Sequence, residues 1–238
     1  NTNTWFLIYT KEYFMNNTLI HANNIYKEYK DNLLILDNLD LEIKKNNFYS
    51  IVGKSGAGKS TLLHLLGLLD IPTKGEIYIN GKPTSNLKPK EIAFLRMSTI
   101  GFVFQSYHLN NSLKAYENVM LPMYVNPKYN YHDMEIKADE LLKLVGLEHR
   151  KHHFPNELSG GEQQRIAIAR ALANDPDCIL ADEPTGNLDK ENESNIFNIF
   201  KKLVIKGKSV VVISHNESVK NYTDKIYELK NGKLEEKH

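Results

Sequence analysis

The sequence is poor in the features that define several common classes of protein. It contains a single cysteine, Cys178, which excludes an internal disulfide framework and favours a reducing compartment such as the cytoplasm. The apolar run at residues 5–9 is far shorter than the roughly 18 to 20 residues that cross a bilayer as a helix. Because 30 Lys and Arg nearly balance 29 Asp and Glu, no overall charge attracts a nucleic acid, and we expect no such partner.

The remaining composition is that of an ordinary folded domain. Hydrophobic residues make up 41% of the chain and charged residues 25%, close to the averages for globular proteins, so disorder and a fibrous structure are both disfavoured. Met15 is the first methionine, and the segment that it opens resembles the start of a protein chain. We therefore expect residues 1–14 to be a non-native or disordered extension and residues 15–238 to form a single domain.

Short apolar runs alternate with helical patterns along most of the chain. Residues 19–29 and 39–43 alternate partly between apolar and polar, with Asp31 and Asn32 as a turn signal, which predicts an antiparallel β layer. The later strands are predicted at residues 48–52, 76–79, 100–104, 178–181, 209–213 and 225–229, and helices at residues 61–69, 115–123, 134–145, 161–173 and 191–205. Such alternation predicts an α/β fold with a mostly parallel sheet covered on both faces. Asn231 and Gly232 predict a tight hairpin turn near the end.

One long stretch of helical periodicity contains no convincing strand. It runs over residues 106–158 and predicts a helical subdomain, at about residues 106–160, inserted into the α/β core. Its apolar and aromatic side chains form either the core of that subdomain or a groove for a partner helix. They include Tyr107, Leu109, Tyr116, Met120, Met123 and Tyr124.

The strongest motif is the octapeptide GKSGAGKS at residues 53–60, which fits a phosphate-binding loop without mismatch. It follows an apolar strand and precedes a helix, as the motif requires. Its glycines let backbone N–H groups converge on phosphate oxygens, while Lys59 would neutralise the β and γ phosphates and Ser60 would bind Mg²⁺. The alternative, a glycine-rich turn with a solvated lysine, needs this spacing and both flanks to arise by chance. The predicted nucleotide-binding residues here are Gly53, Ser55, Gly56, Gly58, Lys59, Ser60 and Thr61.

Two adjacent acids follow a later apolar run. Asp182 immediately follows the predicted strand at residues 178–181, where a phosphate-binding loop needs a carboxylate to hold Mg²⁺. Glu183 comes next and is placed to act as a general base or to orient the attacking water. Two surface acids ending a strand would look the same in isolation. The phosphate-binding loop makes the catalytic interpretation the better one.

The segment LSGGEQ at residues 158–163 resembles the signature sequence of ABC ATPases. This resemblance implies a RecA-like P-loop NTPase fold and covers residues 19–235. It implies that the signature segment contacts the γ phosphate bound to a second copy of the chain through Ser159, Gly160, Gly161 and Gln163. The helix beginning at Gly161 can present N–H groups to a phosphate.

The same resemblance assigns roles to four isolated residues. Gln105 resembles the glutamine that ligates Mg²⁺ and reports to the membrane partner, and His215 resembles the histidine that contacts the γ phosphate. Asp189 resembles the aspartate that couples the two sites. Tyr29 stands where the family has an aromatic residue that stacks on adenine, with Tyr26 as a nearby competitor. Any one of these alone would be an ordinary strand-end or cap residue.

The segments at residues 62–70 and 182–189 further resemble the macrolide-exporter and lipoprotein-releasing branch of this family. That resemblance implies a subunit that hydrolyses ATP, forms a head-to-tail dimer around two MgATP and powers a separate membrane permease. It also implies a cytoplasmic location, peripheral to the inner face of the membrane. The substrate would be an exported or extracted peptide, drug or lipid-linked molecule.

Two other functions fit part of the pattern. A soluble ABC ATPase acting on nucleic acid or ribosomes would resemble a tandem cassette or carry coiled-coil arms, and the sequence shows neither. A P-loop kinase or GTPase would leave the signature segment without a role. The chain also has no Asn-Lys-x-Asp motif for reading guanine.

Overall fold

The computed structural model describes residues 17–29 and 33–237. The extension expected at residues 1–14 and the turn expected at Asp31 and Asn32 lie outside these described residues.

The amino-terminal part of the chain forms a four-stranded antiparallel sheet in the order β2-β1-β4-β5. Its strands are β1 (Thr18–Tyr29), β2 (Leu33–Lys44), β4 (Lys74–Ile79) and β5 (Lys82–Pro83). The antiparallel layer predicted from the sequence is present. However, β2 begins six residues before the predicted start at residue 39, and its register with β1 shifts between Lys27 and Glu28. Such a bulge breaks the alternation on which the prediction relied.

A six-stranded sheet forms the centre of the molecule, in the order β10-β9-β3-β8-β7-β6. Its strands are β3 (Phe48–Val52), β6 (Ile100–Phe104), β7 (Cys178–Asp182), β8 (Ser209–Ser214), β9 (Lys225–Lys230) and β10 (Lys233–Lys237). All neighbours pair in parallel except β9 and β10. Asn231 and Gly232 join those two strands with φ angles of 50° and 75°, as the predicted hairpin turn requires.

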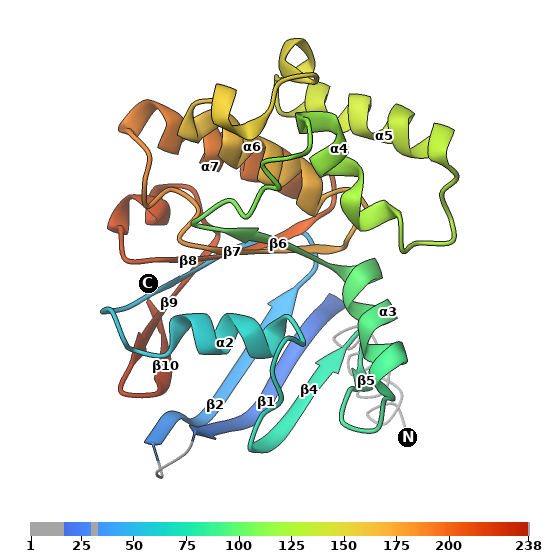
Figure 1. Cartoon of the computed structure of the whole chain (residues 1–238). Coiled ribbons are helices and arrows are strands. Elements are labelled where there is room, and N and C mark those ends of the chain that lie inside the picture. The colour runs from blue at the N-terminus through green and yellow to red at the C-terminus, as the bar shows by residue number, and fades with distance from the viewer. Residues whose placement is uncertain (1–16, 30–32, 238) are drawn as a thin grey trace, which may run out of the picture.

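Helices cover both faces of the six-stranded sheet (Figure 1). The helices are α2 (Lys59–Leu66), α3 (Pro89–Thr99), α4 (Ala115–Met120), α5 (Tyr131–Leu144), α6 (Gly160–Ala171) and α7 (Lys190–Ile205). Short 3₁₀ turns accompany them at η2 (Leu121–Met123), η3 (Glu148–Arg150), η4 (Pro155–Glu157) and η5 (Glu217–Asn221). Helix α2 lies between the two sheets, and α4 to α7 lie on the opposite side of the six-stranded sheet (Figure 1). Two hydrophobic cores result, one on each face.

The structure corrects two predictions about helices. Helix α3 was not predicted, although Pro89 occupies its first turn and the Glu91 carboxylate accepts a hydrogen bond from the Lys88 backbone N–H at 2.7 Å. The helix predicted to reach residue 69 ends at Leu66. Leu68 adopts a left-handed φ of 55°, which an α-helix cannot continue through.

The parallel pairing brings the predicted site residues to one edge of the sheet. Strands β3, β8, β7 and β6 are consecutive neighbours, so their carboxyl ends lie side by side. In the ladder Val52 pairs with Ser214, and Asp182 pairs with both Ile213 and Phe104. The residues that follow these strand ends therefore meet at a single place, where open α/β sheets bind their ligands.

Phe200 offers a test of the packing on one face. Its ring is fully buried and packs edge to face against the ring of Phe48, with 6.0 Å between the two ring centroids. We expect Phe200→Ala to lower the free energy of unfolding by about 3–5 kcal/mol, because a large cavity replaces the ring. Ile205→Ala, on the exposed end of the same helix, should change it by no more than about 0.5 kcal/mol. Urea unfolding curves that shift equally for both variants would contradict this account.

Candidate active site

A cavity of about 460 Å³ opens at the carboxyl edge of the parallel strands. It brings together most of the predicted catalytic, phosphate-binding and metal-binding residues, which come from segments far apart in the sequence. The lining residues are Ile35, Ser55, Gly56, Gly58, Lys59, Ser60, Thr61, Gln105, Asp182, Glu183 and His215. Ile35 was not predicted, because an isoleucine in a strand carries no motif.

The loop between β3 and α2 wraps closely because its glycines allow it. Gly58 has a φ of 97°, and a Cβ there would lie 2.8 Å from Cγ2 of Ile35, so the loop has no room for a side chain at this position. Lys59 is buried, and its Nζ donates to the carbonyls of Gly53 at 2.8 Å and Lys54 at 3.1 Å. The ammonium group is thus held within the loop, at the amino-terminal end of α2, where an anion binds most favourably.

Three oxygen-bearing side chains in the cavity form a donor set for a hard cation. They are Ser60 at the start of α2, Gln105 after β6 and Asp182 at the end of β7. A Cβ at Gly186 would lie 2.8 Å from Nε2 of Gln105, so this glycine leaves space for the glutamine. Hydroxyl, amide and carboxylate oxygens suit Mg²⁺, which is held by one or two carboxylates together with phosphates. Within the described part of the chain, no cluster of three or more His, Cys, Asp or Glu could hold a metal.

Glu183 and His215 contact each other at the edge of the cavity. Oε2 of Glu183 accepts a hydrogen bond from the backbone N–H of His215 at 3.2 Å and lies 2.9 Å from Nδ1 of the ring. Glu183 itself has a left-handed φ of 45°, and its N–H donates to the Ile213 carbonyl at 3.0 Å. The carboxylate is largely buried and the imidazole largely exposed. Both residues were predicted at the site, but their contact was not.

The signature residues lie elsewhere, at the start of α6. Oγ of Ser159 accepts from the Glu162 N–H at 3.3 Å, and the Glu162 carboxylate accepts from both the N–H and the hydroxyl of Ser159 at 2.9 Å. Partial burial raises the pKa of Glu162, but these hydrogen bonds and the 3.1 Å contact with Arg150 outweigh it and hold the pKa below its usual value. Nε2 of Gln163 donates to the Leu158 carbonyl at 3.0 Å.

Asp189 caps the neighbouring helix α7 and lies close to the signature segment. Its Oδ1 accepts from the Asn192 N–H at 2.8 Å. A Cβ at Gly161 would collide with the side-chain amide of Asn192, so the starts of α6 and α7 approach closely. None of the signature residues, nor Asp189, is among the described residues that line the cavity around Lys59.

Tyr29, the predicted adenine platform, also lies outside the lining of this cavity. It ends the described part of β1 and pairs with Leu33, two residues before Ile35 in the cavity wall. Tyr29 is 44% exposed. The competing Tyr26 is half-buried and carries Lys74 over its ring at 5.9 Å.

Known proteins resemble the chain over nearly its whole length. A family model described as ABC transporter matches residues 36–186. An uncharacterized ABC transporter ATP-binding protein of Methanocaldococcus jannaschii is 44% identical, covering 92% of this chain and 98% of that protein. The chain belongs to the ABC transporter family. The lipoprotein-releasing system ATP-binding protein LolD of Francisella tularensis is also 44% identical to this ABC ATPase, over 93% of this chain and 97% of LolD.

Solved structures of ABC cassettes share its fold. The dimeric structure of the cassette MJ0796 superposes with a TM-score of 0.83 at 44% identity, covering 91% of this chain and 97% of that one. A dimeric post-hydrolysis state of MJ0796 bound to ADP and Pi superposes with a TM-score of 0.84 at 42% identity, covering 92% and 98%. The α/β P-loop fold predicted from the sequence is confirmed, and the chain is an ATPase of this family.

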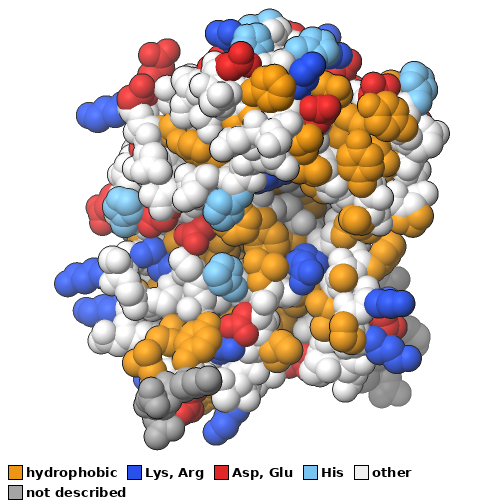
Figure 2. All heavy atoms as spheres, in the orientation of Figure 1, with side chains coloured by type: hydrophobic (Ala, Val, Ile, Leu, Met, Phe, Trp, Pro, Cys, Tyr) orange, Lys and Arg blue, Asp and Glu red, His pale blue; other side chains and the backbone are white. Residues whose placement is uncertain are grey.

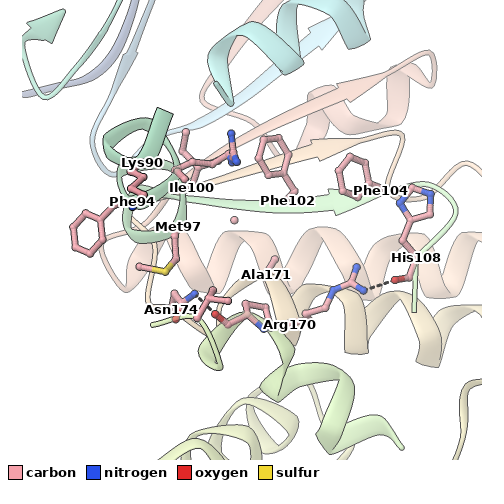
Figure 3. Close-up of a pocket in the computed structure, with 15 residues that line it drawn as sticks. Lys90, Phe94, Met97, Ile100, Phe102, Phe104, His108, Arg170, Ala171 and Asn174 are labelled. Carbon is pink, nitrogen blue, oxygen red and sulfur yellow. Dashed lines mark hydrogen bonds between the residues drawn. The ribbon is translucent and has the colours of Figure 1, made fainter. Parts of the chain in front are cut away.

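A second and larger cavity of this ABC ATPase, of about 810 Å³, lies between α3, β6, η2 and α6. Hydrophobic side chains gather around a hollow near the middle of the molecule in Figure 2. Phe94 and Met97 of α3 and Phe102 and Phe104 of β6 line the cavity, and Arg170 of α6 donates to the His108 carbonyl at its far end (Figure 3). None of the helices in residues 17–29 and 33–237 combines the length and apolar character needed for a bilayer crossing.

This cavity differs from the groove considered in the sequence analysis. Of the aromatic and apolar residues named there, Met120 and Met123 are buried core, and Tyr124 is exposed. Leu109 and Tyr116 pack against the core. The apolar lining comes instead mainly from α3 and β6, and α3 was not predicted. Pro89 and Glu91 are sequence signals for the start of a helix, and giving them weight would have predicted α3.

Substitution of two glycines with similar backbone angles distinguishes the effect of backbone strain from an effect on nucleotide binding. Gly58 has a φ of 97° and Gly146 a φ of 72°, but a Cβ at Gly146 would meet nothing within 4 Å. We expect both Gly→Ala variants to lose about 1–2 kcal/mol of stability from the left-handed backbone. Only Gly58→Ala should also weaken MgATP binding, by about tenfold or more, because its methyl group displaces the loop. Calorimetric titration at a temperature where both variants are folded measures this, and equal affinities for the two would contradict the assignment.

Proposed function

We propose that this chain is the ATP-hydrolysing subunit of an ABC transporter and acts as a head-to-tail dimer. Each ATP would lie between residues 53–60 of one copy and residues 159–163 of the other. The separation of the signature residues from the cavity around Lys59 carries this proposal, because one copy presents only half of a closed site. The dimeric structures of the MJ0796 cassette support it. We also propose that residues 15–238 form one domain, with a helical subdomain at about residues 106–160.

The phosphates would bind at the amino-terminal end of α2. Ser55, Gly56, Gly58 and Lys59 line the cavity at that position, and Thr61 follows in the first turn of the helix, where backbone N–H groups have no partner within the helix. Ser60, Gln105 and Asp182 would hold Mg²⁺, which when bound neutralises charge on the β and γ phosphate oxygens. Ser159, Gly160, Gly161 and Gln163 of the second copy would close over the γ phosphate, and Asp189 would link the two sites.

Glu183 is proposed to accept the proton of the attacking water. Its Oε2 already accepts from His215, so we assign Oε1 to the water. The water oxygen attacks the γ phosphorus, the bond to the β–γ bridging oxygen breaks, and ADP leaves with that oxygen. His215 orients the carboxylate and reaches toward the γ phosphate with its exposed ring. Closure of the dimer would precede each turnover, because it brings the two halves of the site together.

The apolar cavity between α3 and α6 is proposed to receive a cytoplasmic helix of the permease. Phe94 is 60% exposed at its rim, and Gln105 follows β6, which forms its floor, so docking there is adjacent to the metal-binding side chain. The chain would then sit on the cytoplasmic face of the membrane through this contact. The similarity to LolD supports extraction of a lipid-linked substrate, with peptide and drug export as the alternatives within this branch.

Glu183→Gln tests the base and the dimer together. We expect phosphate release to fall by about 10²- to 10⁴-fold, because the amide cannot accept the proton, while MgATP converts the variant to a dimer in light scattering. Glu140→Gln, at an exposed helix position paired with Lys137, should behave as wild type in both measurements. A Glu183→Gln variant that stays monomeric and hydrolyses ATP at the wild-type rate would show that the base assignment is wrong.

Phe94→Ala tests the permease contact. Tyr131 on α5 is a matched control, since it is an aromatic residue of similar exposure, 55%, and is not among the described residues that line the cavity. We expect Phe94→Ala to reduce the membrane-bound fraction of the protein in cells by about tenfold, as loss of an aromatic anchor does at other interfaces. MgATP affinity should stay unchanged. Equal membrane fractions for Phe94→Ala and Tyr131→Ala would place the permease contact elsewhere.

A further inference from the structure

The ring of Tyr29 is fixed by two side chains, those of Asp70 and Lys27, to which the sequence alone assigned no role. Its hydroxyl donates to Oδ2 of Asp70 at 2.9 Å, and Nζ of Lys27 lies 4.8 Å from the ring centroid. Lys27 precedes Tyr29 by two residues, whereas Asp70 comes from a segment forty-one positions further along the chain. The ring is therefore held at its edge and over one face.

Every partner in this arrangement has further hydrogen bonds that fix its own position. Oδ1 of Asp70 accepts from Nζ of Lys27 at 2.7 Å and from the Ile71 N–H at 2.7 Å, and Nζ also donates to the Ile71 carbonyl at 2.8 Å. Lys27 is only 8% exposed, and a nearly buried ammonium group needs such partners. Partial burial raises the pKa of Asp70, but the hydrogen bonds from Lys27, Ile71 and Tyr29 outweigh it and hold the pKa below its usual value.

Asp70 also connects the tyrosine to the phosphate-binding helix. The chain leaves α2 through Gly67, and the Leu69 N–H still donates to the His64 carbonyl within that helix at 2.8 Å. The amino-terminal end of the same helix begins at Lys59. Asp70 therefore ties Tyr29 to the element whose other end carries the phosphate-binding loop. The separation between an aromatic platform and the phosphates is set by this one short helix.

We propose that Asp70, with Lys27 as its counter-ion, is a positioning residue that holds the Tyr29 ring ready to stack on the base of ATP. The proposal rests on the proposed role of Tyr29 as the adenine platform. Lys27 covers one ring face, and the 44% exposure of Tyr29 leaves surface of the ring for a base. A ring whose rotamer is already set loses less conformational entropy when a base stacks on it.

Comparing the affinities for two ligands distinguishes a loss of base positioning from general damage to the site. MgATP carries a base, whereas magnesium tripolyphosphate offers only the phosphates. Calorimetric titration of the whole chain with each ligand should show that Asp70→Asn and Tyr29→Phe weaken MgATP binding about three- to tenfold, the effect of one lost hydrogen bond. Both variants should bind tripolyphosphate as wild type does. The double variant should lose no more than either single one, because both remove the same link.

Two further variants complete the test. Asp139→Asn removes an aspartate that pairs with Lys151 on another part of the surface, and it should bind both ligands as wild type does. Tyr29→Ala should lose MgATP affinity selectively. If it does, but Tyr29→Phe and Asp70→Asn match wild type, the positioning role is wrong and the adenine platform stands. Equal weakening of both ligands by Asp70→Asn would also overturn the proposal, and an unaffected Tyr29→Ala would instead remove the platform itself.

Discussion

Parallel pairing of β3, β8, β7 and β6 is the constraint on which the rest of this ATPase depends. Parallel strands must all end at the same edge of the sheet, so the loops that follow them converge at that edge. Buried, mostly apolar strands make that pairing stable, because helices cover both faces. The phosphate-binding loop, the side chains proposed to bind the metal and the Glu183–His215 pair are therefore held together at the carboxyl edge of the central sheet.

The second half of the proposed site, at the signature segment, depends on helix capping and not on strand pairing. At Gly161, where α6 begins, the absence of a side chain leaves room for the side-chain amide of Asn192 on α7, and each helix start is capped by its own residue, Ser159 or Asp189. Caps of this kind hold the first N–H groups of a helix in a fixed direction. The start of the signature helix is thus preorganised for the partner contact proposed above. Its distance from the cavity around Lys59 makes sense if assembly of two copies is itself a step of the proposed cycle.

Much of the fold was predictable, and the errors have identifiable causes. Strands β3 and β6 were predicted with the bounds that the structure shows, because short apolar runs bounded by glycine or polar residues stand out. Helix α3 was missed because it presents so little apolar surface to the core; Thr99 is its one buried residue. The start of β2 was missed because the bulge beside Lys27 interrupts its alternation. The predicted helical character of the stretch between β6 and β7 was correct.

The sequence by itself determined the chemistry, and the tertiary structure decided the contacts. Residues 53–60, 158–163 and 182–183 are contiguous motifs whose proposed roles depend on local backbone geometry, so spacing along the chain was enough to predict them. The contact of Glu183 with His215, the link from Tyr29 to Asp70 and the groove beside α3 join residues that are distant in sequence. Each requires two elements to pack at one distance and orientation. That depends on the side chains between them, which no local pattern records.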